Sequence, residues 1–321
     1  STPQSTAKPA SQLGPLPGQS LGLAGRDPAQ PNFASRLLLA WLARQAARRR
    51  KRAIARQGVQ GGGVPKPPRA APNSTHHAGQ PVAHAALAPK IDAAQAAFLK
   101  ALRAGMDTPS FPVGLSALQV RKVVALKVPG AAGPMNARLY VPRGRVKGAV
   151  LFLHGGGFVH CGLNSHHGMC CRLARISGAA VLLPEYRLAP EHPFPAAADD
   201  ALAAYRWLLG CSRQLWGGKV AVAGDSAGGN LAAVVAQDAK AAHLPQPALQ
   251  LLYYPSLYGA QEFPSHRHYA EGYFLSRASM QWYGEQYLAA PQDWAAPRFV
   301  PGLNPVLQGL APAMIITAQC D

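Results

Sequence analysis

The residues best suited to chemistry are a serine and its small neighbours. Ser226 stands in Gly224-Asp225-Ser226-Ala227-Gly228, after an apolar strand predicted at 219–223 and before a helix predicted at 229–242. A sharp turn from strand to helix lifts one side chain to the carboxyl end of the strands and leaves room only for small neighbours. The spacing therefore predicts a nucleophilic serine. The alternative is a chance match in a chain that is rich in glycine and alanine.

A second glycine-rich segment, His154-Gly155-Gly156-Gly157-Phe158, follows another apolar strand predicted at 149–153. Acyl transfer builds negative charge on a carbonyl oxygen, and backbone N–H groups can stabilise it where glycines allow close approach. An ordinary glycine turn is the alternative, but the pairing with the serine segment on two predicted parallel strands favours an oxyanion hole. The predicted donors are the amides of Gly156, Gly157 and Ala227, and the supporting motif residues are His154, Gly155, Gly224, Asp225 and Gly228.

Acidic residues gather in and just after a proline-rich segment at 185–197, EYRLAPEHPFPAA. Carboxylates beside a nucleophile can act as catalytic acids or bases, or can simply hold a loop. We interpret this set as structural, with polar side chains fixing a loop next to the serine turn. The four residues are Glu185, Glu191, Asp199 and Asp200.

The elements that would position these residues alternate between strands and helices. Short continuous apolar runs are typical of strands buried on both faces of a parallel sheet. Alternation with helices indicates βαβ units, so the sequence predicts an α/β fold with a mainly parallel sheet. The predicted strands are 120–128, 137–141, 149–153, 179–183, 219–223, 248–254 and 313–318, and the predicted helices are 91–104, 196–209 and 229–242.

Taken together, HGGGF, YRLAPEHPFPAA and GDSAGGNLAA resemble the hormone-sensitive-lipase family of α/β-hydrolases, in its bacterial esterase branch. The resemblance covers residues 91–321. It implies an α/β-hydrolase fold and a serine carboxylesterase that acts on short- to medium-chain acyl esters without a cofactor. It also implies a helical cap over the site, built from the helix near 91–105 and the segment after Tyr254. Residues 271–275 are similar to the family's cap segment.

The same resemblance suggests where the rest of a catalytic triad lies. The chain order in this fold is serine, then an acid, then histidine. The family's acid follows a strand in an A-x-x-D pattern, which here is Ala318 to Asp321, so Asp321 is the expected acid. None of the 11 histidines follows Asp321. We therefore expect the base beyond the end of this chain, the last strands and helix of the domain to be missing, and this chain to be nearly inactive.

A non-catalytic function, the binding of a small ligand, is the alternative hypothesis. Some proteins similar to this family keep the serine and glycine motifs, lose the histidine and bind a small ligand. The residue at the histidine position would separate a small-ligand binding protein from an esterase, whose partner would be a small-molecule ester.

The net charge of +18 lies mostly outside the predicted domain. Residues 1–90 hold 13 Lys and Arg and one acid, whereas residues 91–321 hold 19 basic and 13 acidic residues. Low complexity predicts that 1–90 is a disordered extension, with a helix permitted at 33–57. Its basic run at 48–52 indicates either an anionic-surface contact or a solvated tail. No nucleic acid is expected for 91–321.

Cysteine and histidine usage predicts neither a metal site nor a disulfide framework. The five cysteines are odd in number and contain no CxxC pair, and no apolar stretch reaches the length of a membrane span, so we expect a cytoplasmic protein. His166-His167-x-x-Cys170-Cys171 lacks the spacing of a four-ligand zinc site. The sequence leaves open whether the protein is a monomer or a homodimer.

Overall fold

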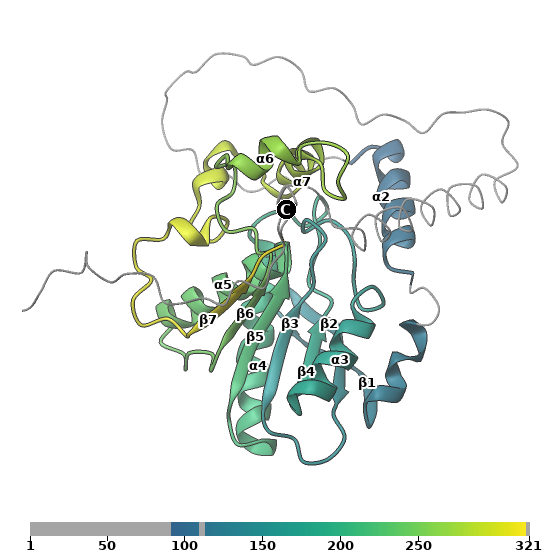
Figure 1. Cartoon of the computed structure of the whole chain (residues 1–321), viewed down its shortest axis with the longest axis vertical. Coiled ribbons are helices and arrows are strands. Elements are labelled where there is room, and N and C mark those ends of the chain that lie inside the picture. The colour runs from purple at the N-terminus through teal and green to yellow at the C-terminus, as the bar shows by residue number, and fades with distance from the viewer. Residues whose placement is uncertain (1–90, 109–112, 319–321) are drawn as a thin grey trace, which may run out of the picture. The chain divides into compact units, whose positions relative to one another are not determined.

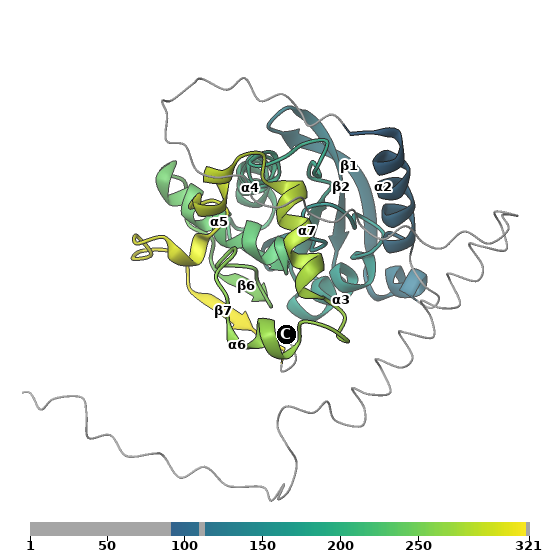
Figure 2. The ribbon, with the colours of Figure 1, turned by 90° about the horizontal axis from the view of Figure 1, so that it is seen from above.

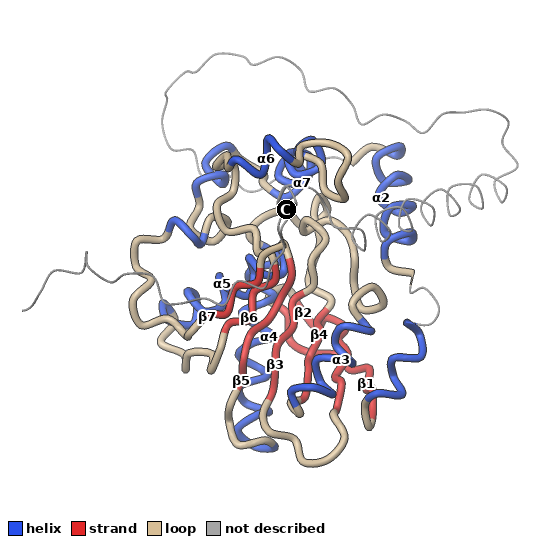
Figure 3. The backbone as a smooth tube through the Cα atoms, in the orientation of Figure 1, coloured by secondary structure: helices blue, strands red, loops and turns tan. Residues whose placement is uncertain are grey.

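A seven-stranded, mainly parallel sheet forms the centre of the domain in the computed structural model, which describes residues 91–108 and 113–318. The strand order is β1-β2-β4-β3-β5-β6-β7 (Figures 1 and 3). The pairs from β4 through β3, β5 and β6 to β7 are parallel, whereas β2 is antiparallel to both β1 and β4. This arrangement confirms the predicted fold class. The extension 1–90, with its permitted helix at 33–57, lies outside the described residues.

The strands lie close to their predicted positions. The largest difference is at 129–134, where a turn was expected. Both strands of the hairpin continue instead and pair up to Gly130 and Gly133, so that the turn shrinks to two alanines. The bounds are β1 Lys122–Gly130, β2 Gly133–Val141, β3 Ala149–Leu153, β4 Ala180–Pro184, β5 Val220–Asp225, β6 Gln250–Tyr253 and β7 Ala313–Ile316.

The helices include several that the apolar pattern did not predict. Helix α4 runs six residues past the predicted end at Leu209, and α3 was not predicted. The helical elements are α2 Ala93–Met106, η1 Val113–Gln119, α3 His167–Ser177, α4 Ala196–Leu215, α5 Ala227–Ala241, α6 Pro264–His268, α7 Arg277–Tyr287, η2 Pro291–Ala295 and η3 Pro301–Leu303. Within the described ranges, no helix combines the length and apolarity that crossing a bilayer requires.

The core has two layers because β3 buries both of its faces. Successive side chains of a strand point to opposite faces of the sheet. Leu151 and Leu153 accordingly pack in the larger cluster, with side chains from α4 and α5. Val150 and Phe152 pack in a second cluster, with side chains from α3. All five residues of β3 are buried, which explains its uninterrupted apolar sequence.

Two helices from distant parts of the chain lie side by side over the carboxyl ends of the strands. They are α2 and α7, seen at the top of Figure 1 and from above in Figure 2. The Phe98 and Trp282 rings meet edge to face with centroids 5.9 Å apart, and Gln95 Nε2 donates to Gln286 Oε1 at 2.9 Å. These are the two segments from which a cap was expected.

Candidate active site

The turn between β5 and α5 consists of Ser226 alone. Its backbone has φ 52° and ψ −118°, a region that costs a non-glycine residue roughly 1–3 kcal/mol. The Ser226 amide donates to the Tyr253 carbonyl at 2.9 Å, and the Ser226 carbonyl accepts from the Asn230 amide at 3.0 Å. The surrounding chain therefore imposes the sharp turn that the sequence predicts.

Two glycines flanking Ser226 are required by close backbone contacts. A Cβ atom on Gly224 would overlap the Gly228 carbonyl oxygen, and one on Gly228 would overlap the Leu153 carbonyl oxygen. The first turn of α5 thus packs directly against the end of β3. This contact fixes the serine turn beside the loop that follows β3.

Asp225 joins the serine turn to that loop. Its Oδ1 accepts the Gly155 amide at 2.9 Å, and the His166 Nε2 atom lies 3.1–3.2 Å from its two carboxylate oxygens. A Cβ atom on Gly155 would overlap the Asp225 carboxylate. Asp225 is buried, so these contacts are shielded from water. Its role in the structure is to position the glycine loop relative to Ser226.

The glycine loop presents backbone amides without acceptors. Gly156 and Gly157 have φ angles of 118° and 60°, which glycine adopts without strain. Within residues 91–108 and 113–318, the amides of Gly156, Gly157 and Ala227 donate to no acceptor. Ala227 is the first residue of α5, where the helix dipole also favours negative charge. The loop and the turn can therefore stabilise an oxyanion.

His154 supports the loop as a neutral ring. It is fully buried and stacks on Tyr186, with ring centroids 4.3 Å apart, and its Nδ1 lies 2.8 Å from the Gly155 carbonyl oxygen. Burial, with a smaller effect of the nearby His166, lowers the pKa of His154 to about 4. His154 is therefore a structural residue without charge at neutral pH.

Sequence reasoning missed Tyr283, which α7 places over the glycine loop. A Cβ atom on Gly157 would overlap the Tyr283 ring, and the Tyr283 hydroxyl is hydrogen bonded to His160 Nε2 at 2.7 Å. Burial, followed by the charge of Arg103, lowers the pKa of His160 to about 4. Tyr283 therefore packs directly against Gly157 in the glycine loop.

Arg103 of α2 was missed as well, and it ties the cap to the loops around the site. Its Nε donates to the Val159 carbonyl at 2.8 Å and its Nη2 to the Ala189 carbonyl at 2.9 Å. The guanidinium also pairs with Glu191, at 2.6 Å from Oε2. No local pattern marks Arg103 or Tyr283, since each acts on residues far away in the chain.

Each of the four acids in and just after the proline-rich segment has a hydrogen-bond or ion-pair partner. Glu191 pairs with Arg103, Asp200 pairs with Arg187 at 2.8 Å, Asp199 pairs with Arg298 at 2.8 Å, and Glu185 accepts from Asn136 at 2.9 Å. These contacts agree with the structural interpretation of the segment.

Of the two expected triad residues in this chain, the structure describes Ser226 but not Asp321. Asp321 lies outside the described residues, so the structure gives no position for the expected acid. Among the described histidines, none is hydrogen bonded to Ser226. Ser226 is half-buried at the end of β5, with no hydrogen-bonding base in the part of the chain that the structure covers.

The histidine–cysteine cluster does not converge on one point. His166 reaches Asp225, while His167 Nδ1 lies 3.3 Å from the Tyr140 hydroxyl. Cys170 is buried in the core. In the described ranges, no group of three or more His, Cys, Asp or Glu side chains could hold a metal ion. Cys161, Cys170, Cys171 and Cys211 are free thiols.

Comparison with known proteins gives consistent relatives. Residues 150–321 match a family described by the alpha/beta hydrolase fold. An ethyl acetate hydrolase of Pseudomonas putida is 42% identical over 180 residues, which cover 54% of this chain and 55% of that protein. The carboxylic ester hydrolase LipN of Mycobacterium tuberculosis is 42% identical over 208 residues, covering 62% of this chain and 55% of LipN. The chain thus spans about half the length of these curated relatives.

Solved structures point the same way. A hyperthermophilic esterase from the archaeon Pyrobaculum calidifontis superposes with a TM-score of 0.64 at 38% identity, covering 68% of this chain and 73% of that one. The carboxylesterase EstE1 from a metagenomic library gives a TM-score of 0.60 at 34% identity, covering 67% and 75%. With its motifs, fold and family match in agreement, the chain belongs to the hormone-sensitive-lipase-like family of α/β-hydrolases.

Proposed function

We propose that the protein is a serine carboxylesterase in which Ser226 is the nucleophile. The observation that carries the proposal is the strained Ser226 turn, joined through Asp225 to a loop of unpaired glycine amides. Strained backbone of this kind is found where a fold fixes a reactive side chain. The names of the relatives, all ester hydrolases, support the same reaction class.

The proposed reaction has two acyl-transfer steps. Ser226 Oγ loses its proton to a histidine and forms a bond to the ester carbonyl carbon, while the amides of Gly156, Gly157 and Ala227 stabilise the oxyanion. The histidine returns the proton to the leaving alcohol, and water then cleaves the acyl-enzyme to release the acid. We assign Asp321 as the acid that orients this histidine, which by the chain order of the fold would follow Asp321 in a longer protein.

The proposed substrates are esters of short- to medium-chain acids. The Pseudomonas putida relative is named for ethyl acetate, a small ester. In this chain, the Tyr283 ring packs directly against Gly157, which carries one of the proposed oxyanion donors. We infer that the ring narrows the space for the acyl group. A narrow space favours short acyl groups over long ones.

The test is hydrolysis of p-nitrophenyl acetate, butyrate, octanoate and palmitate by the full-length protein. Ser226→Ala should abolish turnover, because removing the nucleophile typically costs about a million-fold in kcat. Ser177→Ala, at an exposed serine at the end of α3, is the matched control and should retain activity. Turnover that survives in Ser226→Ala refutes the proposal. A wild-type protein that binds esters without releasing p-nitrophenol would favour the small-ligand binding alternative.

A further inference from the structure

The end of the sheet opposite Ser226, where the parallel strands begin, carries a set of basic side chains and no acidic ones. Strands β3, β4 and β5 begin at this end, and β2 ends there beside the start of β1. The segments that form it are 119–122, 142–148, 175–180 and 213–220, and none contains Asp or Glu. We call their eight cations the basic edge: Arg121, Lys122, Arg143, Arg145, Lys147, Arg175, Arg213 and Lys219. All eight are exposed.

These segments are in contact with one another and so form one surface. Arg175 Nε donates to Gln119 Oε1 at 3.3 Å, and the Lys147 amide donates to the Gly178 carbonyl at 3.0 Å. Gly148 lies so close to Lys219 that a Cβ atom on Gly148 would press on the Lys219 carbonyl oxygen. Within the described residues, no cation of the basic edge forms an ion pair with an acid. The ion pairs of the described residues all involve other Arg and His side chains. The acids of the described residues therefore leave the positive charge of this surface unneutralised.

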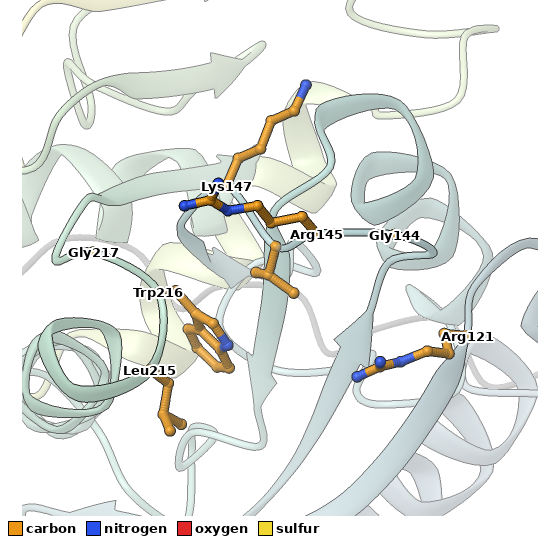
Figure 4. A pocket seen from close by; sticks show the side chains of 8 residues that line it. Arg121, Gly144, Arg145, Lys147, Leu215, Trp216 and Gly217 are labelled. Carbon is orange, nitrogen blue, oxygen red and sulfur yellow. The ribbon is translucent and has the colours of Figure 1, made fainter.

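A depression of about 750 Å³ lies within the basic edge. Its cations come from the start of β1 and from the 142–148 loop, and Trp216 faces them from the chain after α4 (Figure 4). The lining cations are Arg121, Arg145 and Lys147. The cavity is open to solvent, so its charges can face a large partner as well as a small one.

Large apolar side chains stand exposed among the cations. Leu215, which lines the depression, is 65% exposed, and Leu118 and Ile176 at the ends of η1 and α3 are 71% and 64% exposed. Aliphatic side chains among Lys and Arg suit a lipid interface, where the cations meet headgroups and the apolar groups enter the acyl boundary. A nucleic acid offers such aliphatic groups no comparable environment.

We propose that the basic edge docks the protein on a membrane surface rich in anionic phospholipid. Ser226 follows the end of β5, whereas Lys219 precedes its start, so the two lie at opposite ends of the strand. Docking by the basic edge therefore turns the candidate active site away from the bilayer. This inference does not depend on the esterase proposal, and membrane binding should leave the hydrolysis of water-soluble esters unchanged.

The test is cosedimentation of the full chain with vesicles of phosphatidylcholine containing roughly 30 mol % phosphatidylglycerol, compared with phosphatidylcholine alone. The edge variant Arg121→Glu/Arg145→Glu/Lys147→Glu should bind at least about a hundredfold more weakly, since one cation near an anionic surface contributes roughly a fivefold factor. The control variant Lys100→Glu/Lys127→Glu/Arg206→Glu makes the same change in net charge at exposed cations elsewhere and should bind nearly as the wild type does. Circular dichroism melting verifies that both variants fold.

A second variant tests the apolar part of the surface. Leu215→Ser should weaken binding most clearly at high salt, where charge attraction is screened. If the edge and control variants bind vesicles equally weakly, net charge alone explains the binding and the proposal is overturned. If the edge variant binds as well as the wild type, the proposal is also overturned, and the membrane contact is assigned to the basic run at 48–52. Edge-dependent binding of RNA or DNA without vesicle binding would also overturn it.

Discussion

At the scale of single residues, the candidate site depends on backbone that must be held in place. Ser226 occupies a costly conformation, and hydrogen bonds to Tyr253 and Asn230 hold its amide and carbonyl. Asp225 then links this turn to Gly155. An oxyanion hole works because its donors are fixed before charge develops. The contacts around Ser226 supply that fixed geometry without using its side chain.

Gly157 offers a sharp test of this geometry. Gly157→Ala would place a methyl group into the Tyr283 ring and strain a backbone with φ 60°, so the proposed donor must shift. We expect kcat for p-nitrophenyl butyrate to fall about 10²- to 10³-fold, the usual cost of one lost oxyanion donor. Gly210→Ala, at an exposed helix position with open space around it, is the control. Equal kcat values for the two variants would exclude Gly157 as a donor.

At the scale of elements, the cap is held by few but specific contacts. Arg103 gives α2 two hydrogen bonds to backbone carbonyls, at Val159 and Ala189, together with the Glu191 ion pair. Tyr283 gives α7 a contact with Gly157 and a hydrogen bond to His160. The two cap helices thus contact the same short loop after β3, α2 at Val159 and α7 at Gly157 and His160.

Replacing Arg103 should loosen that loop. Arg103→Ala removes charge-assisted hydrogen bonds, each of which contributes about 1.5–3 kcal/mol, so the free energy of unfolding should fall by roughly 2 kcal/mol or more. Esterase activity should fall as well, because the loop carries the proposed donors. Lys100→Ala, on an exposed position of the same helix, should change neither quantity measurably. Urea unfolding and ester hydrolysis measure the two effects, and identical results for both variants would contradict this role for Arg103.

The sequence predicts the features that are encoded within a few neighbouring residues and misses those that depend on contacts between distant residues. Strand β3 was predicted at its observed bounds because both of its faces are buried. The serine and glycine motifs were recognisable because each lies within a few residues. Tyr283 was not, since its partner Gly157 is more than 120 positions away. Helix α4 was predicted too short, because exposed Gly210 resembles a helix end, yet Ser212 beyond it is buried and the helix continues.

Helix α3 was missed for a different reason. Its residue before the first turn, His166, makes no side-chain cap, and its sequence mixes polar and apolar residues. Only three of its side chains, Cys170, Cys171 and Ala174, are buried against the sheet. A stripe this narrow, made of small residues, gives a weak periodic signal. Tertiary packing forms this helix more than local preference does.

At the scale of the whole molecule, the domain has two chemically different ends. The carboxyl ends of the strands carry the candidate site beneath α2 and α7, where the acids Asp225 and Glu191 are found. The opposite end carries the eight cations of the basic edge and no acid in its segments. The modest net charge of residues 91–321 therefore conceals a strong separation of charge. This separation explains why composition alone did not predict the proposed membrane contact.

The stability of the domain should fall steeply in mild acid because two buried histidines lie near the site. The pKa values of His154 and His160 are lowered to about 4 by burial, whereas histidine in an unfolded chain titrates near 6.5. Above pH 6.5 neither state binds these protons. As the pH falls toward 4, only the unfolded state binds them, and the free energy of unfolding decreases by roughly 3 kcal/mol per histidine.

Urea unfolding from pH 7 to pH 4.5 should show this decrease in the free energy of unfolding. His160→Gln should reduce it by about half, and the exposed control His268→Gln should not. Equal slopes for the wild type and His160→Gln would show that folding does not change the protonation of His160, which would contradict its lowered pKa.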